Sequence, residues 1–364
     1  MRDRPIRLTP LFGDPTHMGR LHGAAYHNEI RDYTADRVGI VGSGTWSGKP
    51  ATRDDALALA ERMLPAHEAY APDLHAEMVG MAEAAGISPA EAVIVGGFTD
   101  FVDTVRALGH SELPVEDDCT AVIVPDHRSG GSGFLAQTWD MHDSATEHVV
   151  MLDIQPDEGV RSLVFSTVGC LGQIGMNEAG IAVGINNLVA ADGKIGVTWP
   201  FVVRKALQQT DLDAAAACVL DADLAGAHSF LLFASDGRGC VVEAMPTHRE
   251  LVPLDGEVLV HTNHCLVPAT IRFEAERPDD LQASSRGRLR RAAELLEVGT
   301  VDLDRLVAMT RDPEAICRSS EPPHHVESCG AAIMRPGTGE FWACWGIPSE
   351  NEFERFAMAG PADG

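Results

Sequence analysis

Apolar residues recur at three- and four-residue spacing between Pro15 and Asp103, and this spacing predicts a helical region. Residues 74–85 carry such a stripe, and Gly86 predicts where their helix ends. Residues 88–91 (Ser-Pro-Ala-Glu) have the pattern of a capped helix start, with Pro in the first turn. Asp54 and Asp55 precede another apolar run and predict a further helix start there.

The pattern changes to strands from Cys119 onward, after a polar segment, 109–118, that is expected to be a loop. Thr120–Val124 is nearly all apolar, and a Gly-rich turn connects it to Phe134–Asp140, which predicts a β-hairpin. Further strands are predicted at 148–154, 162–167, 180–188, 229–234, 240–243, 258–263, 331–334 and 340–345, and helices at 201–209, 212–220 and 284–297. Strands grouped in this way favour a layered α+β fold over a βαβ alternation.

Composition restricts the function further. The 364 residues suggest two ordinary domains or one large layered domain. Twenty-eight basic against 54 acidic residues give a net charge of −26 with no basic run, which disfavours binding to nucleic acid or to an anionic membrane. No apolar stretch of 18 residues and no secretory signal are visible, and the eight cysteines include no C-x-x-C pair. We therefore expect a cytoplasmic protein with no membrane span.

Common cofactor patterns are missing from the sequence, including the P-loop, G-x-G-x-x-G, H-E-x-x-H and G-x-S-x-G. Two groups of His and Cys could be considered for a metal: His261, His264 and Cys265, and residues 324–329. On a strand, His261 and Cys265 would share one face while His264 would lie on the other. We therefore expect no metal site.

Cys119 lies at the point where an acidic loop, 116–118, enters the first predicted strand. The hairpin folds the chain back, so that Asp140 can return to the neighbourhood of Cys119. From composition alone, such a cysteine is either a small buried apolar residue or a nucleophile.

Asp118-Cys119-Thr120, followed by Gln137-Thr138-Trp139-Asp140, resembles the penicillin acyltransferase family. These are the acyl-coenzyme A:6-aminopenicillanic acid acyltransferases and their bacterial relatives, which are N-terminal nucleophile (Ntn) hydrolases. The resemblance extends over almost the whole chain, through segments 18–23, 72–86, 169–188, 199–204, Glu243, the Asn263 segment and 346–348. It implies an α+β fold of the four-layer αββα type. It also implies self-cleavage between Asp118 and Cys119, giving a helical fragment 1–118 and a catalytic fragment 119–364 that remain together as one structural domain.

The resemblance also implies a catalytic set. Cys119 would be the nucleophile, and its new α-amine, with a reference pKa near ~8, would serve as its base. Asp140 would orient the amine and the thiol, and Asn263 would donate its amide to the oxyanion. From the pattern alone, Asp140 could instead be a solvent-facing carboxylate and Asn263 a turn residue.

Three further residues are implied to bind substrate: Asn187, and the pair Ser285 and Arg286, which would contact a carboxylate. Asn187 could equally cap a turn. The neighbouring Arg288, Arg290 and Arg291 leave open the alternative of a solvated basic helix face.

This sequence departs from the family pattern at two positions. Asp118 stands where the fungal pattern has Gly, which restricts the backbone at the bond to be cleaved. Gln137 stands where the choloylglycine hydrolases have Arg, so bile-salt hydrolysis is not expected.

The sequence thus predicts an autoproteolytic Ntn amidase or acyltransferase that acts through an acyl-cysteine thioester on a small acyl amide or acyl thioester. No cofactor is expected, although coenzyme A is compatible as an acyl donor, and the sequence leaves open whether the molecule forms a homo-oligomer. The alternative is an unprocessed, non-catalytic relative that binds an acyl ligand or a partner. A metal-dependent hydrolase is a third alternative.

Overall fold

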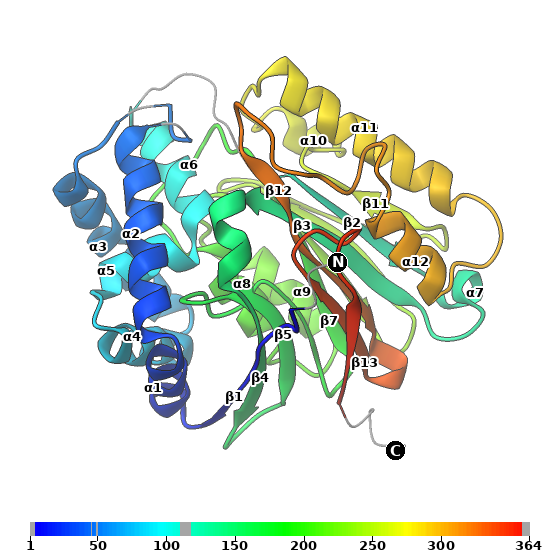
Figure 1. The fold of residues 1–364 in the computed structure, drawn as a ribbon, viewed down its shortest axis with the longest axis horizontal. Coiled ribbons are helices and arrows are strands. Elements are labelled where there is room, and N and C mark those ends of the chain that lie inside the picture. The colour runs from blue at the N-terminus through cyan, green and yellow to red at the C-terminus, as the bar shows by residue number, and fades with distance from the viewer. Residues whose placement is uncertain (1–3, 45, 49, 110–117, 359–364) are drawn as a thin grey trace.

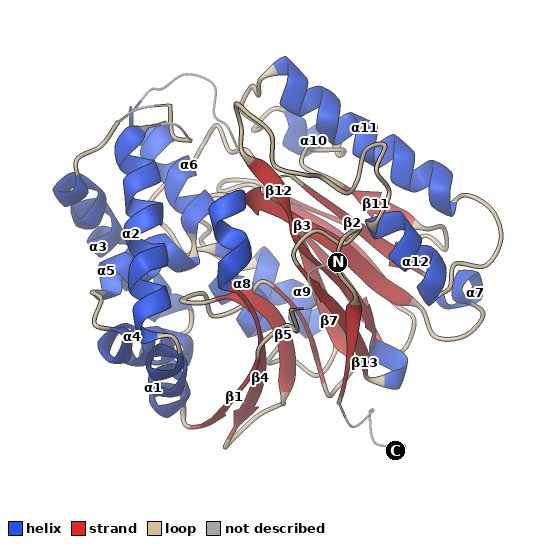
Figure 2. Cartoon of the chain, viewed as in Figure 1, coloured by secondary structure: helices blue, strands red, loops and turns tan. Residues whose placement is uncertain are grey.

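The computed structural model describes residues 4–44, 46–48, 50–109 and 118–358, which build two β-sheets flanked by helices (Figures 1 and 2). The eight-stranded sheet has the order β1-β4-β5-β6-β7-β8-β9-β10. Its strands are β1 (Leu8–Gly13), β4 (Val149–Pro156), β5 (Ser162–Thr167), β6 (Ile174–Asn177), β7 (Ile181–Leu188), β8 (Ala227–Ala234), β9 (Gly239–Ala244) and β10 (Arg249–Pro253).

The six-stranded sheet has the order β11-β2-β3-β12-β13-β14, with all its pairs antiparallel. Its strands are β11 (Leu259–His261), β2 (Cys119–Val124), β3 (Phe134–His142), β12 (Val326–Arg335), β13 (Glu340–Trp345) and β14 (Phe353–Ala357). The two sheets pack face to face through β2 and β3 of one and β7 and β8 of the other. Gln137 on β3 links them by hydrogen bonds to the backbone N and O of Ile185 on β7, at 2.8 and 2.9 Å.

Helices cover the outer sides of the two sheets, as Figure 2 shows, with α1–α6 on one side and α11 and α12 on the other. The helices are α1 (Pro15–Ala25), α2 (His27–Ser43), α3 (Arg53–Tyr70), α4 (Pro72–Ala85), α5 (Pro89–Gly96), α6 (Phe98–Gly109), α7 (Asp126–Ser129), α8 (Trp199–Ala206), α9 (Leu212–Leu220), α10 (Pro268–Ile271), α11 (Asp279–Leu296) and α12 (Leu303–Thr310). Helix α9 packs on β8 and β9, whereas α11 and α12 pack on the six-stranded sheet. The predicted four-layer αββα sandwich is confirmed.

The N-terminal helices begin and end largely where their sequence signals place them. Helix α4 ends at Gly86 with φ +71°, and α5 begins with the predicted capping box of Ser88 and Glu91. One predicted start is wrong: α3 begins at Arg53, because the Thr52 side chain accepts the hydrogen bond from the Asp55 N–H. Thr is a good N-cap residue, so the cap lies two residues before the predicted acidic pair.

Close backbone contact joins α1 to α4. A Cβ atom added at Gly23 would lie 2.3 Å from the carbonyl oxygen of Met81, and one at Gly80 would lie 2.5 Å from that of Thr16. Only glycine permits such close approach of the two backbones. Gly23 on α1 and Gly80 on α4 therefore allow these helices to pack together. The strand before α1, β1, adds to the edge of the eight-stranded sheet by parallel pairing with β4.

Several elements depart from the sequence prediction. Strands β1, β6, β10 and β14 and helix α12 were not predicted, and β11 ends at His261, two residues earlier than expected. The predicted loop 109–118 lies outside the described residues except for its two ends. No single helix in the described ranges is long and apolar enough to cross a membrane; α4 and α5 meet the length and composition criteria only as a pair bent by 106°.

Candidate active site

Cys119 is the first residue of β2, and its side chain is fully buried in the core between the two sheets. The strand β3 pairs with β2 in the predicted hairpin, with Cys119 opposite Trp139. Asp140, the residue after Trp139, therefore lies beside the 118–119 peptide bond. The β-hairpin and its approach to Cys119 are confirmed.

Both residues joined by the 118–119 peptide bond are held by hydrogen bonds. The backbone N–H of Asp140 donates to the carbonyl oxygen of Asp118 at 3.0 Å. On the other side of the bond, the N–H of Cys119 donates to Oδ1 of Asn263 at 2.6 Å. The carbonyl that Cys119 would attack thus already faces a backbone donor.

The side chain of Asp118 is completely buried and is surrounded by three arginines, which we call the arginine cage: Arg277, Arg288 and Arg318. Arg288 donates to Oδ1 of Asp118 at 2.7 Å, and Arg318 contacts Oδ2. Arg277 is farther away, at 3.9 Å from Oδ1.

Arg288 connects the two sides of the 118–119 bond. Its guanidinium, which is 1% exposed, also donates to the carbonyl oxygen of Cys119 and, at 3.0 Å, to Oδ1 of Asn263. One buried cation therefore contacts both residues of the bond and the asparagine beside it. Arg277 and Arg318 carry no signal in the sequence, and Arg288, which could have belonged to a solvated basic helix face, is buried.

Asn263 lies just beyond the end of β11, and its amide is fixed on both sides. Its Nδ2 donates to the backbone oxygen of Asn187 at 3.0 Å, while its Oδ1 faces Cys119. Its own N–H donates to Oγ of Ser285 at 3.0 Å. The structure thus brings Asn263 to Cys119, the backbone of Asn187 to the Asn263 side chain, and the Ser285 hydroxyl to the Asn263 N–H.

Helical geometry separates Ser285 from Arg286. Residues three and four apart share a face of a helix, whereas adjacent residues do not. Ser285 and Arg288 accordingly face inward from α11, whereas Arg286 is exposed to solvent. The spacing from Ser284 and Ser285 to Arg288 is the sequence signal that could have found the cage arginine on this helix.

Asp140 is fully buried, and burial raises the pKa of its carboxyl group to about 7, although the nearby charge of Arg288 acts in the opposite direction. A carboxyl group with a pKa near neutrality can both accept and release a proton at physiological pH. Burial lowers the pKa of His264, the residue after Asn263, to about 4, so this imidazole is neutral above that pH.

The histidines near Asn263 have structural partners. His261 lies between Glu243 and Ser229, both at 3.0 Å, and Glu243 also accepts a hydrogen bond from the Leu266 N–H at 2.6 Å. This buried network holds the chain that carries Asn263. Within the described ranges, no three His, Cys, Asp or Glu side chains lie together as metal ligands.

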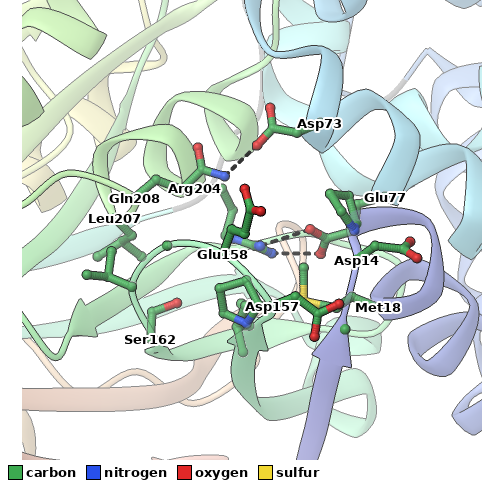
Figure 3. A pocket seen from close by; sticks show the side chains of 16 residues that line it. Asp14, Met18, Asp73, Glu77, Asp157, Glu158, Ser162, Arg204, Leu207 and Gln208 are labelled. Atoms are coloured by element: carbon green, nitrogen blue, oxygen red, sulfur yellow. Dashed lines mark hydrogen bonds and ion pairs between the residues drawn. The ribbon is translucent and has the colours of Figure 1, made fainter.

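Of two cavities of similar size, only the smaller one lies next to the residues around Asp118. The larger one, about 450 Å³, lies between α1, α4, α8 and the β4–β5 turn, away from Cys119, and Figure 3 shows its acidic lining. Arg204 and Glu77 form a bidentate ion pair in it, at 2.8 and 2.9 Å. A second cavity, about 400 Å³, lies between α11 and residues 314–318 and includes Ser284 and Arg318 in its wall.

The sequence model of one family matches residues 127–350, which is more than half of the chain: Acyl-coenzyme A:6-aminopenicillanic acid acyl-transferase. The chain belongs to this family. The expected family resemblance is thereby confirmed, and the family's chemistry of acyl transfer or hydrolysis applies to this enzyme. The match begins after Cys119, so that residue itself lies outside it.

Similar proteins agree with this assignment. The acyl-coenzyme A:6-aminopenicillanic-acid-acyltransferase 40 kDa form of Emericella nidulans is 25% identical over 260 residues, which cover 70% of this chain and 68% of that protein.

Among solved structures, an N-acylethanolamine-hydrolyzing acid amidase ortholog of Caenorhabditis elegans matches with 15% identity and a TM-score of 0.43, over 60% of this chain and 93% of that one. Conjugated bile acid hydrolase from Clostridium perfringens matches with 10% identity and a TM-score of 0.45, over 67% and 98%.

Proposed function

We propose that this family member cleaves itself before Cys119 and then acts as a cysteine amidase or acyltransferase on a small acyl amide or acyl thioester. The observation that carries the proposal is the arrangement of the 118–119 peptide bond. Its carbonyl oxygen accepts a hydrogen bond from Asp140 N–H, and its nitrogen donates to Asn263, next to the thiol that would attack.

Self-cleavage would begin with transfer of the Cys119 thiol proton to Asp140, whose raised pKa suits it for this step. The sulfur then attacks the Asp118 carbonyl carbon, and the Asp140 N–H stabilises the oxyanion. The C–N bond breaks as the Cys119 nitrogen takes the proton back, which leaves a thioester. Water hydrolyses this thioester to a carboxylic acid at Asp118 and a free thiol at Cys119.

The processed enzyme would repeat the same chemistry on an external carbonyl. The free α-amine of Cys119 takes the thiol proton, sulfur forms the acyl thioester, and the leaving amine or thiol receives the proton. Water as acceptor then gives hydrolysis, whereas an amine or thiol acceptor gives acyl transfer. His264 is an unsuitable base in this scheme because its imidazole is buried against Ser285 and its pKa is low.

An intact-mass measurement of the purified protein tests the proposal. We expect two polypeptides, with the larger beginning at Cys119, instead of the single 38.9 kDa chain. The Cys119→Ala variant is expected to stay uncut and to lose all acyl-cleaving activity. A wild-type chain that stays intact would favour the non-catalytic relative, and a Cys119→Ala chain cut at the same bond would point to an external protease.

A further inference from the structure

We infer that the arginine cage is the acyl subsite of the processed enzyme and selects an acyl group that carries a carboxylate. This inference rests on the proposed function and adds the chemical class of the substrate. The acyl group would have its carboxylate separated from the reacting carbonyl by two carbon atoms, as in an aspartyl or succinyl group.

In self-cleavage, the aspartyl group of residue 118 is the first acyl group that the Cys119 sulfur would attack. In the uncleaved chain its carbonyl is the one next to the thiol, so its side chain occupies the position of a substituent on the acyl side of the bond. That side chain is an anion, and it is completely buried. Because the same sulfur attacks the internal and the external carbonyl, the side chain of Asp118 marks where the substituent of an external acyl group would lie.

The residues around this position are built to bind a carboxylate. Arg288 donates to one oxygen of Asp118 at 2.7 Å, and Arg318 and Ser284 contact the other, the serine hydroxyl at 3.2 Å. Arginine guanidinium groups bind carboxylates with directed, charge-assisted hydrogen bonds. This local group of cations lies in a chain whose net charge is −26, so it is not a consequence of overall composition.

The cavity of about 400 Å³ gives this position a route to solvent. Ser284 and Arg318 line the cavity and also contact Asp118, so the carboxylate lies directly behind the cavity wall. Gly287 is in the same wall, and a Cβ atom added there would meet nothing within 4 Å. Departure of Asp118 after cleavage would therefore join the cavity to Cys119.

An apolar acyl group would be disfavoured in this subsite. It would take the place of Asp118 without offering an acceptor to the arginines and the serine, and a buried donor that loses its acceptor is unfavourable. Sites built to bind a polar group discriminate strongly against analogues that lack it. The carboxylate is therefore the specificity element, and Arg318, at the edge of the cavity, is the residue that admits it.

The test compares three p-nitroanilides as substrates of the processed wild-type enzyme: N-acetyl-aspartyl, N-acetyl-asparaginyl and N-acetyl-leucyl. We expect kcat/KM for the aspartyl compound to exceed the other two by about tenfold or more. The Arg318→Gln variant should lose most of this preference, measured as the ratio of kcat/KM for the aspartyl compound to kcat/KM for the asparaginyl compound. Arg238→Gln, an exposed arginine in the β8–β9 turn that pairs with Asp213 and Asp236, changes the net charge equally and should retain the preference.

The outcomes separate this inference from the proposed function. Equal or better hydrolysis of the asparaginyl or leucyl compound, abolished by Cys119→Ala, would overturn the carboxylate subsite and leave the cysteine mechanism standing. If wild type cleaves none of the anilides, calorimetry with N-acetyl-aspartate and N-acetyl-asparagine decides: binding at least tenfold tighter for the aspartate supports the subsite, and equal or absent binding overturns it. The wild-type comparison needs no variant, so it holds even if Arg318→Gln fails to process.

Discussion

Two buried carboxylates bind arginine in this molecule, and they differ in what surrounds them. Glu77 makes one bidentate pair with Arg204, and both side chains are almost inaccessible to solvent, at 1% and 3% exposed. Asp118 lies among three arginines, one of which, Arg318, is 25% exposed, and both groups border a cavity. The first pair joins two helices, whereas the second group surrounds a peptide bond next to a thiol.

The difference teaches how a structural ion pair can be told from a site. When both oxygens of a carboxylate bind one guanidinium, the hydrogen bonds of the pair are complete, and the pair is structural. A carboxylate that several cations contact from different elements, beside a thiol and a peptide bond, occupies a place that another anion can take. The four predictions below test this distinction.

The largest effect is expected from breaking the Glu77–Arg204 pair. Arg204→Met leaves Glu77 buried without its cation, which typically costs about 3–5 kcal/mol of unfolding free energy. Chemical denaturation of the uncut Cys119→Ala protein, with and without Arg204→Met, measures this cost. Arg318→Gln in the same background should change the unfolding free energy by about 1 kcal/mol or less, because that side chain is partly solvated. Equal losses from the two substitutions would refute the distinction.

The next effect concerns turnover. Asn263→Ala removes the carboxamide whose Oδ1 accepts from Cys119 N–H and whose Nδ2, bound to Asn187 O in the uncut chain, is the candidate oxyanion donor. Loss of such a donor lowers kcat by about 10²–10³. The variant should keep its fold, because Ser285 binds the backbone N–H of residue 263 and not its side chain. Steady-state kinetics of the cleaved variant measure the effect, and an unchanged kcat would remove Asn263 from the oxyanion role.

A smaller effect is expected in the pH dependence of stability. The pKa of Asp140 is raised to about 7 in the folded protein, so folding favours the protonated acid. Its contribution is fully present below the unfolded pKa of about 4 and is lost as pH rises through 7, by up to about 1.4 kcal/mol per pH unit. Denaturation of Cys119→Ala and of Cys119→Ala/Asp140→Asn between pH 4 and 8 should show stabilities that diverge, with the Asn variant gaining relative to its parent. Parallel curves would show that Asp140 is solvated.

The smallest effect is a shift in the pH–rate profile. If the α-amine of Cys119 is the base, the rising limb of kcat/KM should lie near or somewhat below ~8, because nearby arginines oppose a charged amine. Asp140→Asn removes a negative charge, so the limb should move to lower pH by about one unit while the rate falls. Activity that survives selective acetylation of this amine, with the thiol intact, would contradict the Ntn mechanism.

Much of the fold could be predicted from the sequence because its signals are local. The β2–β3 hairpin, β5, α9 and β13 follow from short apolar runs bounded by turn residues. The unpredicted strands β1 and β14 lie at sheet edges, where one side of the strand is unpaired and the apolar pattern is weak. The predicted start of helix α3 was wrong only because Thr52, two residues before the acidic pair, is the N-cap residue.

The site could be predicted only in part, for a physical reason. Cys119, Asp140 and Asn263 come together because strand pairing places them there, and a hairpin is readable from sequence. The arginine cage comes from α11 and two separate segments, 277 and 318, that no periodicity connects. Arg286 and Arg288 differ by two positions on one helix, and only the direction in which the helix faces decides which guanidinium reaches Cys119.

The position of strand β1 affects the order of folding and cleavage. The strand belongs to the segment before Asp118, yet it completes an edge of the sheet that the rest of the chain builds, and Figure 1 shows it beside β4. The covalent connection gives β1 and the helices that follow a high effective concentration during folding. After a cut at residue 118, packing alone would hold them. We therefore expect the two fragments of the cleaved protein to elute together on size exclusion. Fragments that are expressed separately and then mixed should regain little activity, because their assembly is bimolecular.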